Sequence, residues 1–471
     1  MLFNSLSFLL FFPIVCAVWF CIPTAWIRIR NLWLLLASYY FYMNWEPAYA
    51  LLLLSSTVIT YAASLGIAGS QRTGIRKAWL TGSLVLNLGI LFLFKYYNFL
   101  AANVASVLSA TGLAMELPAF SLLLPVGISF YTFQALGYSI DVYRGTTRVE
   151  RDFATYALFV SFFPQLVAGP IERSTHLLPQ FRQRHPLRPI HLWRGLQLMV
   201  WGYFLKLVLA DRCGIYVDAV WNNLDEHNGG SYLLAAMLFP WQIYGDFAGY
   251  SLIAIGAARM MGFRLCTNFR RPYFSCSIGE FWHRWHISLS TWFKDYLYIP
   301  LGGNRVSRIR NYFNLLVTFT VSGIWHGANW TFCLWGVWHG LLLCLEKCCA
   351  AIRLPFTSSR IYGLLRWALT YAAVCVGWVL FRAPSLREAV RFMSEMVTRW
   401  ATPLFSRVEV GLCLLAVAIV VALEFVLEYS SRRHLLRLAD STLMSLALAL
   451  VIAFITLFGI MDSSQFLYFQ F

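Results

Sequence analysis

The residues most able to do chemistry in this sequence are two histidines in the stretch Val321–Gly340, VSGIWHGANWTFCLWGVWHG. His326 and His339 stand among aliphatic, aromatic and small residues, in a run long enough to cross a bilayer at about 20 residues per helix. An ionisable group at that depth is costly, so such a histidine is a candidate for function. Gly327 leaves space beside the His326 imidazole for a substrate or another helix. The alternative is a neutral histidine packed in a helical bundle, and we assign His339 to packing.

A second cluster of polar and aromatic residues occupies Ile278–Pro300, which contains GEFWHRWHISLSTWFKDYLYIP. This mixture is too polar for a lipid-facing span and predicts an amphipathic helix at the membrane interface. His283 and His286 are three residues apart and would share one face of that helix. With His326 and His339 they could also converge on a metal ion, but the sequence lacks HEXXH and has no carboxylate at ligand spacing. We therefore predict no metal site.

The two stretches together carry a resemblance to a known family. The motif WHGANW at 325–330, preceded by FWHRWHISLSTWFKDYLYIPLGG at 281–303, resembles the membrane-bound O-acyltransferase superfamily, and within it the bacterial alginate O-acetyltransferase branch. Two long aromatic-rich motifs in this order are more specific than a WHG tripeptide alone. The similarity spans most of the chain and is strongest from Leu124 to Gly340. One departure is His283, where we expect arginine or another polar residue.

The resemblance implies a substrate class that the residues alone do not give. Members of this branch move an acetyl group from a cytoplasmic thioester, with acetyl-CoA as the expected donor and no permanently bound cofactor. The acceptor is an exported polysaccharide such as alginate or cellulose. The resemblance also implies a bacterial inner-membrane location and a periplasmic acetyltransferase partner, whose serine is an alternative immediate acceptor. It assigns no residues to donor binding.

Acyl transfer to a hydroxyl requires a base that takes the hydroxyl proton and a group that stabilises the oxyanion on the thioester carbonyl. A histidine in low-dielectric surroundings stays neutral and able to accept a proton near pH 7. We predict that His326 is the general base. His286 is the predicted second catalytic group, which either orients the acceptor or donates to the developing oxyanion.

Three other functions share these sequence features. A related branch of the same fold transfers D-alanine to teichoic acid and differs in its donor. A polysaccharide transporter would use intramembrane histidines as proton relays and would not respond to an acyl-CoA. A membrane metal enzyme would bind stoichiometric iron or zinc.

Composition places the chain in a membrane. Of its 471 residues, 59% are hydrophobic and 12% are charged, and the mean hydropathy is +0.62. That charged fraction is about half the ~25% of an ordinary soluble domain. The net charge of +16 fits basic cytoplasmic loops in contact with anionic membrane lipids, and no nucleic-acid motif accompanies it. Several of the 11 cysteines stand inside apolar runs without CxxC spacing, so they predict buried thiols and not disulfides or zinc ligands.

The elements that must position the histidines are transmembrane helices. We predict an all-α, polytopic protein with eleven to thirteen spans around an intramembrane cavity. It forms a single domain over residues 1–471, with catalytic motifs in 278–340 and further helices in 362–471. Basic residues after the first and third spans place both loops in the cytoplasm. The clearest expected spans are Ser5–Ile22, Asn31–Met43, Ala48–Gly66, Trp79–Phe94, Leu192–Leu209, Tyr232–Met261, Tyr362–Phe381, Val410–Val426 and Leu443–Phe458.

Several polar or helix-breaking residues interrupt these apolar runs. Pro125–Gly127 predicts an unwound segment that borders the cavity. Lys206 is expected to reach toward the membrane surface, and Asp246 to pair with a buried cation or shape the cavity. Glu424 and Glu428 are expected at the interface. The C-terminal QFLYFQF is expected to lie close to the membrane surface, and we assign it no chemistry.

Overall fold

The computed structural model describes residues 1–113, 118, 120, 125–167, 169–349, 359–431 and 441–460. The described chain is helical and contains no strand. The C-terminal QFLYFQF lies outside the described residues. The chain separates into two compact units, which are described in turn: unit 1 comprises Met1–Gly195 and Ala254–Cys266, and unit 2 comprises Leu196–Ile253 and Thr267–Phe471. The prediction of a single domain stays a prediction.

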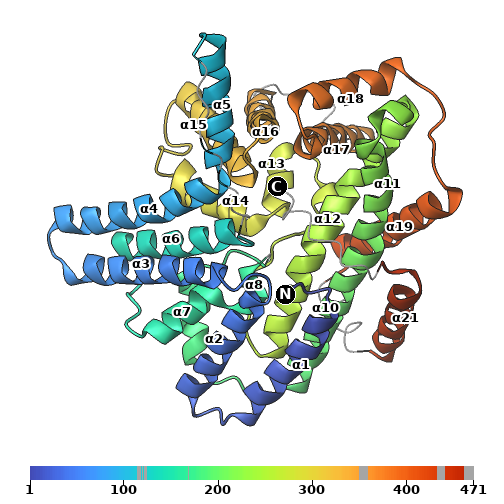
Figure 1. Cartoon of the computed structure of the whole chain (residues 1–471). Coiled ribbons are helices and arrows are strands. Elements are labelled where there is room, and N and C mark those ends of the chain that lie inside the picture. Colours follow the sequence, from blue (N-terminus) through green and yellow to red (C-terminus); the bar gives the residue numbers. More distant parts are fainter. Residues whose placement is uncertain are drawn as a thin grey trace. The chain divides into compact units, whose positions relative to one another are not determined.

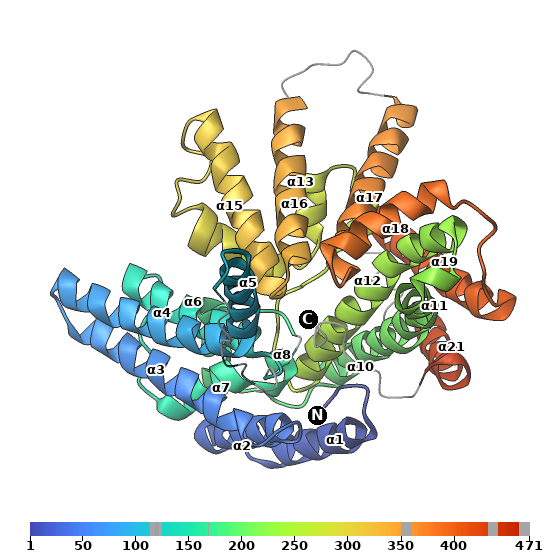
Figure 2. The same ribbon diagram turned by 45° about the horizontal axis from the view of Figure 1, so that its top comes forward.

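Unit 1 is built from helices near the N-terminus of the chain. In Figures 1 and 2, α3, α4 and α6 lie side by side, and these three helices contact one another. The helical segments that lie wholly in this unit are α1 Leu6–Cys21, α2 Ile27–Met43, α3 Tyr49–Gly69, α4 Thr73–Lys95, α5 Tyr97–Ala110, α6 Ile128–Arg144, α7 Phe153–Ser161, α8 Phe163–Leu166, α9 Ser174–Leu177 and η1 Leu178–Arg182. The first four overlap the first four predicted spans, and α3 and α4 are long and apolar enough to cross a membrane.

Helix α6 begins at the predicted interruption. Gly127 directly precedes it with a left-handed φ of 75°, a conformation that costs glycine little. A Cβ on Gly127 would lie 2.6 Å from the backbone oxygen of Leu166, so this close approach also requires glycine. Most of the preceding run, 117–124, lies outside the described residues.

Unit 2 holds both histidine stretches. Two helices, α10 Pro189–Tyr203 and α12 Gly229–Met260, have residues in both units. The remaining segments of unit 2 are the π-helical η2 Phe204–Ala210, α11 Asp211–Asn222, η3 Leu224–Glu226, η4 Pro272–Phe274, α13 Ile278–Arg284, α14 Ile287–Phe293, the π-helical η5 Lys294–Tyr298, α15 Arg308–His326, α16 Trp330–Cys349, α17 Arg360–Arg382, α18 Leu386–Thr398, α19 Arg407–Tyr429 and α21 Thr442–Phe458.

The prediction that Val321–Gly340 forms one membrane-spanning run is wrong. Helix α15 ends at His326 and α16 begins at Trp330, so the stretch contains the end of α15, a short turn and the start of α16, two adjacent helices in Figure 2. Gly327 is extended, and the Phe332 ring fills the place of its missing side chain, because a Cβ there would lie 2.1 Å from Phe332 Cε2. The turn therefore depends on glycine, and His326 becomes the last residue of a helix.

The prediction of one amphipathic helix over Ile278–Pro300 is also wrong. Helix α13 ends at Arg284 and α14 begins at Ile287. His286 separates them with a left-handed φ of 43°, which is uncommon for a residue with a Cβ. Because the helix breaks between His283 and His286, the two imidazoles do not share a helical face.

Five helices among the described residues are long and apolar enough to cross a membrane, namely α3, α4, α16, α17 and α19. Two shorter apolar helices, α1 and α21, accompany them. The count of eleven to thirteen spans stays a prediction.

Lys206 corrects a further prediction. It is buried, with 1% of its side chain exposed, and its Nζ contacts Asp211 Oδ1 at 2.8 Å and Asp246 Oδ1 at 2.7 Å. The expectation that Lys206 reaches the membrane surface is therefore wrong, because two carboxylates hold the ammonium inside unit 2. The expectation that Asp246 pairs with a buried cation is confirmed.

The two glutamates of α19 differ from each other. Glu424 is buried and accepts a hydrogen bond from the Tyr244 hydroxyl, and its interfacial position stays a prediction. Glu428 is partly exposed and forms ion pairs with Arg271 and Arg284.

Candidate active site

His326 lies at the C-terminal end of α15 in an aromatic enclosure. Its side chain is buried, and its imidazole centroid lies 4.9 Å from Trp325, 5.0 Å from Trp335 and 5.3 Å from Phe381, each in an edge-to-face arrangement. Aromatic walls exclude water and lower the local dielectric constant, which favours the neutral imidazole. A neutral imidazole is the form that can accept a proton.

The space that Gly327 leaves beside His326 is filled by the neighbouring helix α16. The sequence leaves room at Gly327 for a substrate or for another helix, and the Phe332 ring of α16 occupies it. Gly323, one turn earlier on α15, has the same effect, because a Cβ there would lie 2.2 Å from the Phe332 oxygen. These glycines bring α16 close and place Trp335 against the imidazole.

His286 is held at the break between α13 and α14 by Asn268. Its Nδ1 lies 3.1 Å from the Asn268 side-chain oxygen, which also accepts from the backbone N–H of Ser288 at 3.3 Å and from its hydroxyl at 2.9 Å. Because that oxygen is an acceptor, Nδ1 of His286 carries the proton and Nε2 carries the lone pair. The sequence analysis missed Asn268, which has no motif around it and stands 18 residues before His286.

The charge state of His286 follows from its burial. The side chain is 1% exposed and lies outside the candidate membrane spans. Burial lowers the pKa of His286 from 6.5 to about 3, because the charged imidazolium loses its hydration. The residue is therefore neutral throughout the physiological pH range.

The two predicted catalytic histidines contact the same indole ring. The Trp325 centroid lies 6.2 Å from His286 and 4.9 Å from His326. The residues are 40 positions apart in the sequence, and the break at His286 together with the end of α15 brings them to one side chain. The structure thus places the two predicted catalytic residues in one cluster.

His339 lies in α16 within the same aromatic packing. It is fully buried, with its ring 5.1 Å from Trp282 and 5.1 Å from Trp335. Its Nδ1 accepts a hydrogen bond from the Trp282 indole at 3.4 Å. Gly377 of α17 faces its Nε2, which a Cβ would approach to 2.7 Å. These contacts are those of a packed histidine, although its assignment to packing stays a prediction.

His283 stands apart from the other three. It is exposed, and its Nδ1 lies 2.6 Å from the backbone oxygen of Gly279. Within the described ranges, no group of three or more histidine, cysteine or acidic residues has metal-binding geometry. The absence of a metal site stays a prediction.

A cavity of about 610 Å³ approaches the cluster. Ile287, which follows His286, and Ser322, one helical turn before His326, both line it. The polar side chains around it include His283, Ser290, Thr291, Lys294, Asn304, Thr318, Glu346 and Lys347. Lys347 is fixed there by a hydrogen bond from its Nζ to Asn311 Oδ1 at 2.8 Å. The cavity therefore combines apolar walls with two lysines and one glutamate.

Comparison with known proteins gives consistent relationships. Residues 148–386 match the model of the membrane-bound O-acyltransferase family. A protein named probable alginate O-acetylase from Azotobacter vinelandii is 42% identical over 84% of this chain and 78% of its own length. Its namesake from Pseudomonas syringae is 40% identical over 84% of this chain and 75% of its own length. A peptidoglycan O-acetyltransferase from Helicobacter pylori is 33% identical over 84% of this chain and 80% of its own length.

Proposed function

Because this chain belongs to the membrane-bound O-acyltransferase family, and so is a multi-pass membrane O-acyltransferase, we propose that it supplies acetyl groups for O-acetylation of an exported polysaccharide. The acetylated polymer is alginate- or cellulose-like. Support comes from relatives named as O-acetylating enzymes that align over 84% of the chain. The bacterial inner membrane is the proposed location.

The observation that carries the mechanism is the contact of His286 and His326 with one indole inside an aromatic enclosure. His326 takes the proton of the acceptor hydroxyl while the hydroxyl oxygen attacks the thioester carbonyl. The tetrahedral intermediate then collapses, the carbon–sulfur bond breaks and the thiol leaves with the proton. This sequence needs a base that is neutral before the reaction, and burial favours that form.

For His286 we propose the first of its two predicted roles, orientation of the acceptor. Nδ1 donates to Asn268, so Nε2 is an acceptor and can receive the hydrogen bond of a substrate hydroxyl. The alternative, donation to the oxyanion, would require protonation of Nε2. That is unfavourable because burial lowers the pKa of His286 to about 3.

The proposed donor is acetyl-CoA, and the proposed donor site is the cavity of about 610 Å³. Lys294 and Lys347 suit the phosphate groups of the donor, since ammonium groups pair with phosphate. Trp282 and Phe319 line the apolar part of the cavity, where an uncharged thioester arm would lie. The acceptor is either a sugar hydroxyl or the serine of a periplasmic acetyltransferase partner.

A reconstituted transfer assay tests this function. The purified protein in proteoliposomes receives acetyl-CoA with a radiolabelled acetyl group, together with the periplasmic partner and oligosaccharide acceptors. Label should enter the acceptor fraction with the wild type and fall at least a hundredfold with His326→Ala, a loss within the range for removal of a general base. His191→Ala, at a partly exposed histidine of unit 1, is the control and should retain activity.

The outcomes separate the competing functions. Wild-type transfer by a stably inserted His326→Ala variant would remove His326 from the mechanism. Polysaccharide uptake that does not depend on acetyl-CoA would instead identify a transporter.

A further inference from the structure

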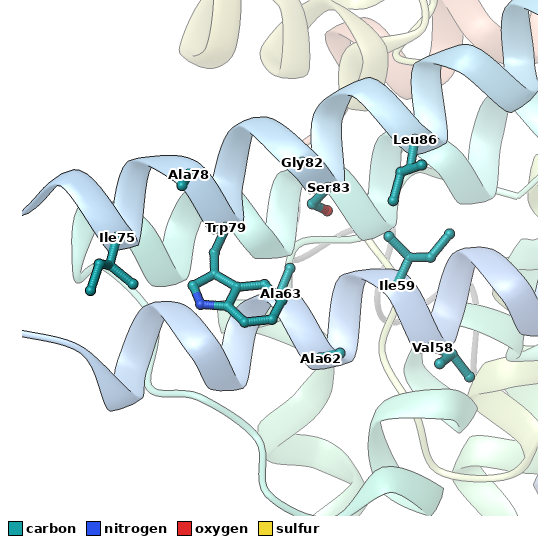
Figure 3. Close-up of a pocket in the computed structure, with 10 residues that line it drawn as sticks. All are labelled: Val58, Ile59, Ala62, Ala63, Ile75, Ala78, Trp79, Gly82, Ser83 and Leu86. Carbon is teal, nitrogen blue, oxygen red and sulfur yellow. The ribbon is translucent and has the colours of Figure 1, made fainter.

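Unit 1 contains an apolar groove, of about 560 Å³, between α3 and α4. Figure 3 shows it lined by Val58 and Ala62 from α3 and by Ala78, Gly82 and Leu86 from α4. Both helices are candidate membrane spans, and few residues of α4 are buried. The groove therefore lies on a surface that faces the hydrocarbon of the bilayer.

Small residues create the groove. A Cβ built on Gly82 meets no atom within 4 Å, so the space beside α4 is open there. Trp79 lies between the two helices in Figure 3, and its indole occupies the place that a side chain on Gly66 would take, because a Cβ on Gly66 would lie 2.4 Å from the ring. Gly66 thus lets the indole lie between the helices without clashing with α3.

One polar atom faces this apolar space. Ser83 lines the groove and is 1% exposed, and its hydroxyl oxygen has no hydrogen-bond partner among the described residues. It does not use the usual partner of a serine inside a helix, the carbonyl one turn earlier. A buried hydroxyl without a partner costs free energy, so Ser83 is a polar defect in the packing beside the groove.

The end of the groove near the α3–α4 turn is positively charged. Arg72, Arg76 and Lys77 stand at the start of α4, and the sequence has no acidic residue between Glu46 and Glu116. Arg76 donates through Nη2 to the Tyr143 oxygen at 2.8 Å, which leaves its Nε without a partner among the described residues. The sequence places this turn in the cytoplasm, where anionic headgroups attract basic side chains.

We propose that this groove binds one anionic phospholipid of the cytoplasmic leaflet. The lipid phosphate pairs with Arg72, Arg76 and Lys77, and one acyl chain lies along the groove. From Ile75 to Leu86 the lined part of α4 is roughly 16 Å long at 1.5 Å per residue, which suits an extended acyl chain. This binding is independent of the proposed acetyl transfer.

Native mass spectrometry of the full-length protein, released from vesicles of equal phosphatidylglycerol and phosphatidylcholine content, measures the binding. The wild type should retain one phosphatidylglycerol molecule. Gly82→Leu fills the groove and should reduce that retention at least tenfold. Gly89→Leu is the matched control, because Gly89 lies on the same helix, does not line the groove and also has no atom within 4 Å of a built Cβ.

Charge variants test the headgroup contacts. Arg72→Gln and Lys77→Gln should each weaken phosphatidylglycerol retention roughly fivefold, the equivalent of about 1 kcal/mol per cation near the membrane surface, and should leave phosphatidylcholine unchanged. Equal retention of the two lipids by the wild type would overturn the proposal. So would equal lipid loss in Gly82→Leu and Gly89→Leu. A change of oligomeric state in Gly82→Leu with unchanged lipid retention would assign the groove to a protein helix instead.

Discussion

The side-chain oxygen of Asn268 lies 3.1 Å from Nδ1 of His286 and accepts a hydrogen bond from the Nδ1–H group. The same oxygen binds the hydroxyl and the backbone N–H of Ser288, which fixes the orientation of the amide. As a result, His286 presents the lone pair of Nε2 and not an N–H group. The chemistry available to this histidine is therefore set by a residue outside both histidine motifs.

Replacing Asn268 with aspartate should make the reaction sensitive to acid. Burial lowers the pKa of His286 to about 3, so in the wild type this group stays neutral from pH 8 to pH 5. A carboxylate on Nδ1–H stabilises the imidazolium and raises the pKa. In Asn268→Asp the rate should fall as the pH drops, because the charged form cannot accept a hydrogen bond at Nε2. An unchanged pH–rate profile would show that the state of His286 does not limit transfer.

The burial of His286 also predicts a loss of stability in acid. Its pKa is about 3 in the folded protein, against 6.5 for a histidine exposed to water, so the unfolded state binds the proton first. Stability from this residue is complete above pH 6.5 and decreases as the pH falls toward 3. Between pH 7 and pH 5 the free energy of unfolding should decrease by about 2 kcal/mol. Thermal unfolding should show a smaller pH effect in His286→Asn. An identical effect in that variant would exclude His286 as the cause.

The two catalytic candidates should respond differently to asparagine. An amide can replace a hydrogen bond but cannot take a proton near neutral pH. His326→Asn should therefore lose about 10²- to 10⁴-fold in specific activity, whereas His286→Asn should retain measurable transfer. The measurement is the rate per folded enzyme with an acyl thioester donor. Equal, near-complete losses would mean that the two histidines act as one unit.

His339 provides the comparison for this pair, because it is a buried histidine of the same aromatic cluster. His339→Gln should lower the thermal midpoint more than the rate, since its contacts are those of packing. A loss of rate larger than that of His326→Asn would identify His339 as the base.

Removing metals should not affect the enzyme. We expect the purified protein to contain no stoichiometric transition metal and to keep its activity in a chelator, because His283 stands apart from the histidine cluster and hydrogen-bonds to the backbone oxygen of Gly279. Elemental analysis and an activity assay check this together. One metal per chain, lost along with activity, would contradict the proposed mechanism.

The buried lysine of unit 2 should be important for stability. Lys206→Met keeps much of the volume but leaves Asp211 and Asp246 without the cation between them. Breaking a buried ion pair in this way costs about 3–5 kcal/mol. The thermal midpoint should fall strongly and recover in part when both aspartates are changed to asparagine. Arg387→Met, at an exposed position of α18, should have little effect. A Lys206→Met variant as stable as the wild type would contradict the prediction.

The sequence by itself determined the class, the family and the reaction type of this protein. A high apolar content and runs of about 20 apolar residues identify membrane helices, and the structure begins and ends α1, α3, α19 and α21 within a few residues of the predicted spans. The motifs WHGANW and FWHRWH indicated the O-acyltransferase family, which the comparisons confirmed. These properties depend on residue types and their order along the chain, so they can be predicted from short segments of the sequence.

Only the tertiary structure decided where the helices break and what each buried polar group contacts. Periodicity did not reveal the turn after His326, because that turn depends on the packing of Phe332 beside Gly327. It did not reveal the left-handed backbone conformation of His286 or the hydrogen bond between that side chain and Asn268. The sequence also wrongly predicted that Lys206 reaches toward the membrane surface. Each of these depends on atoms brought together from distant positions of the chain or across a turn. The free energy of a buried polar group is set by such partners, and hydropathy along the sequence does not contain them.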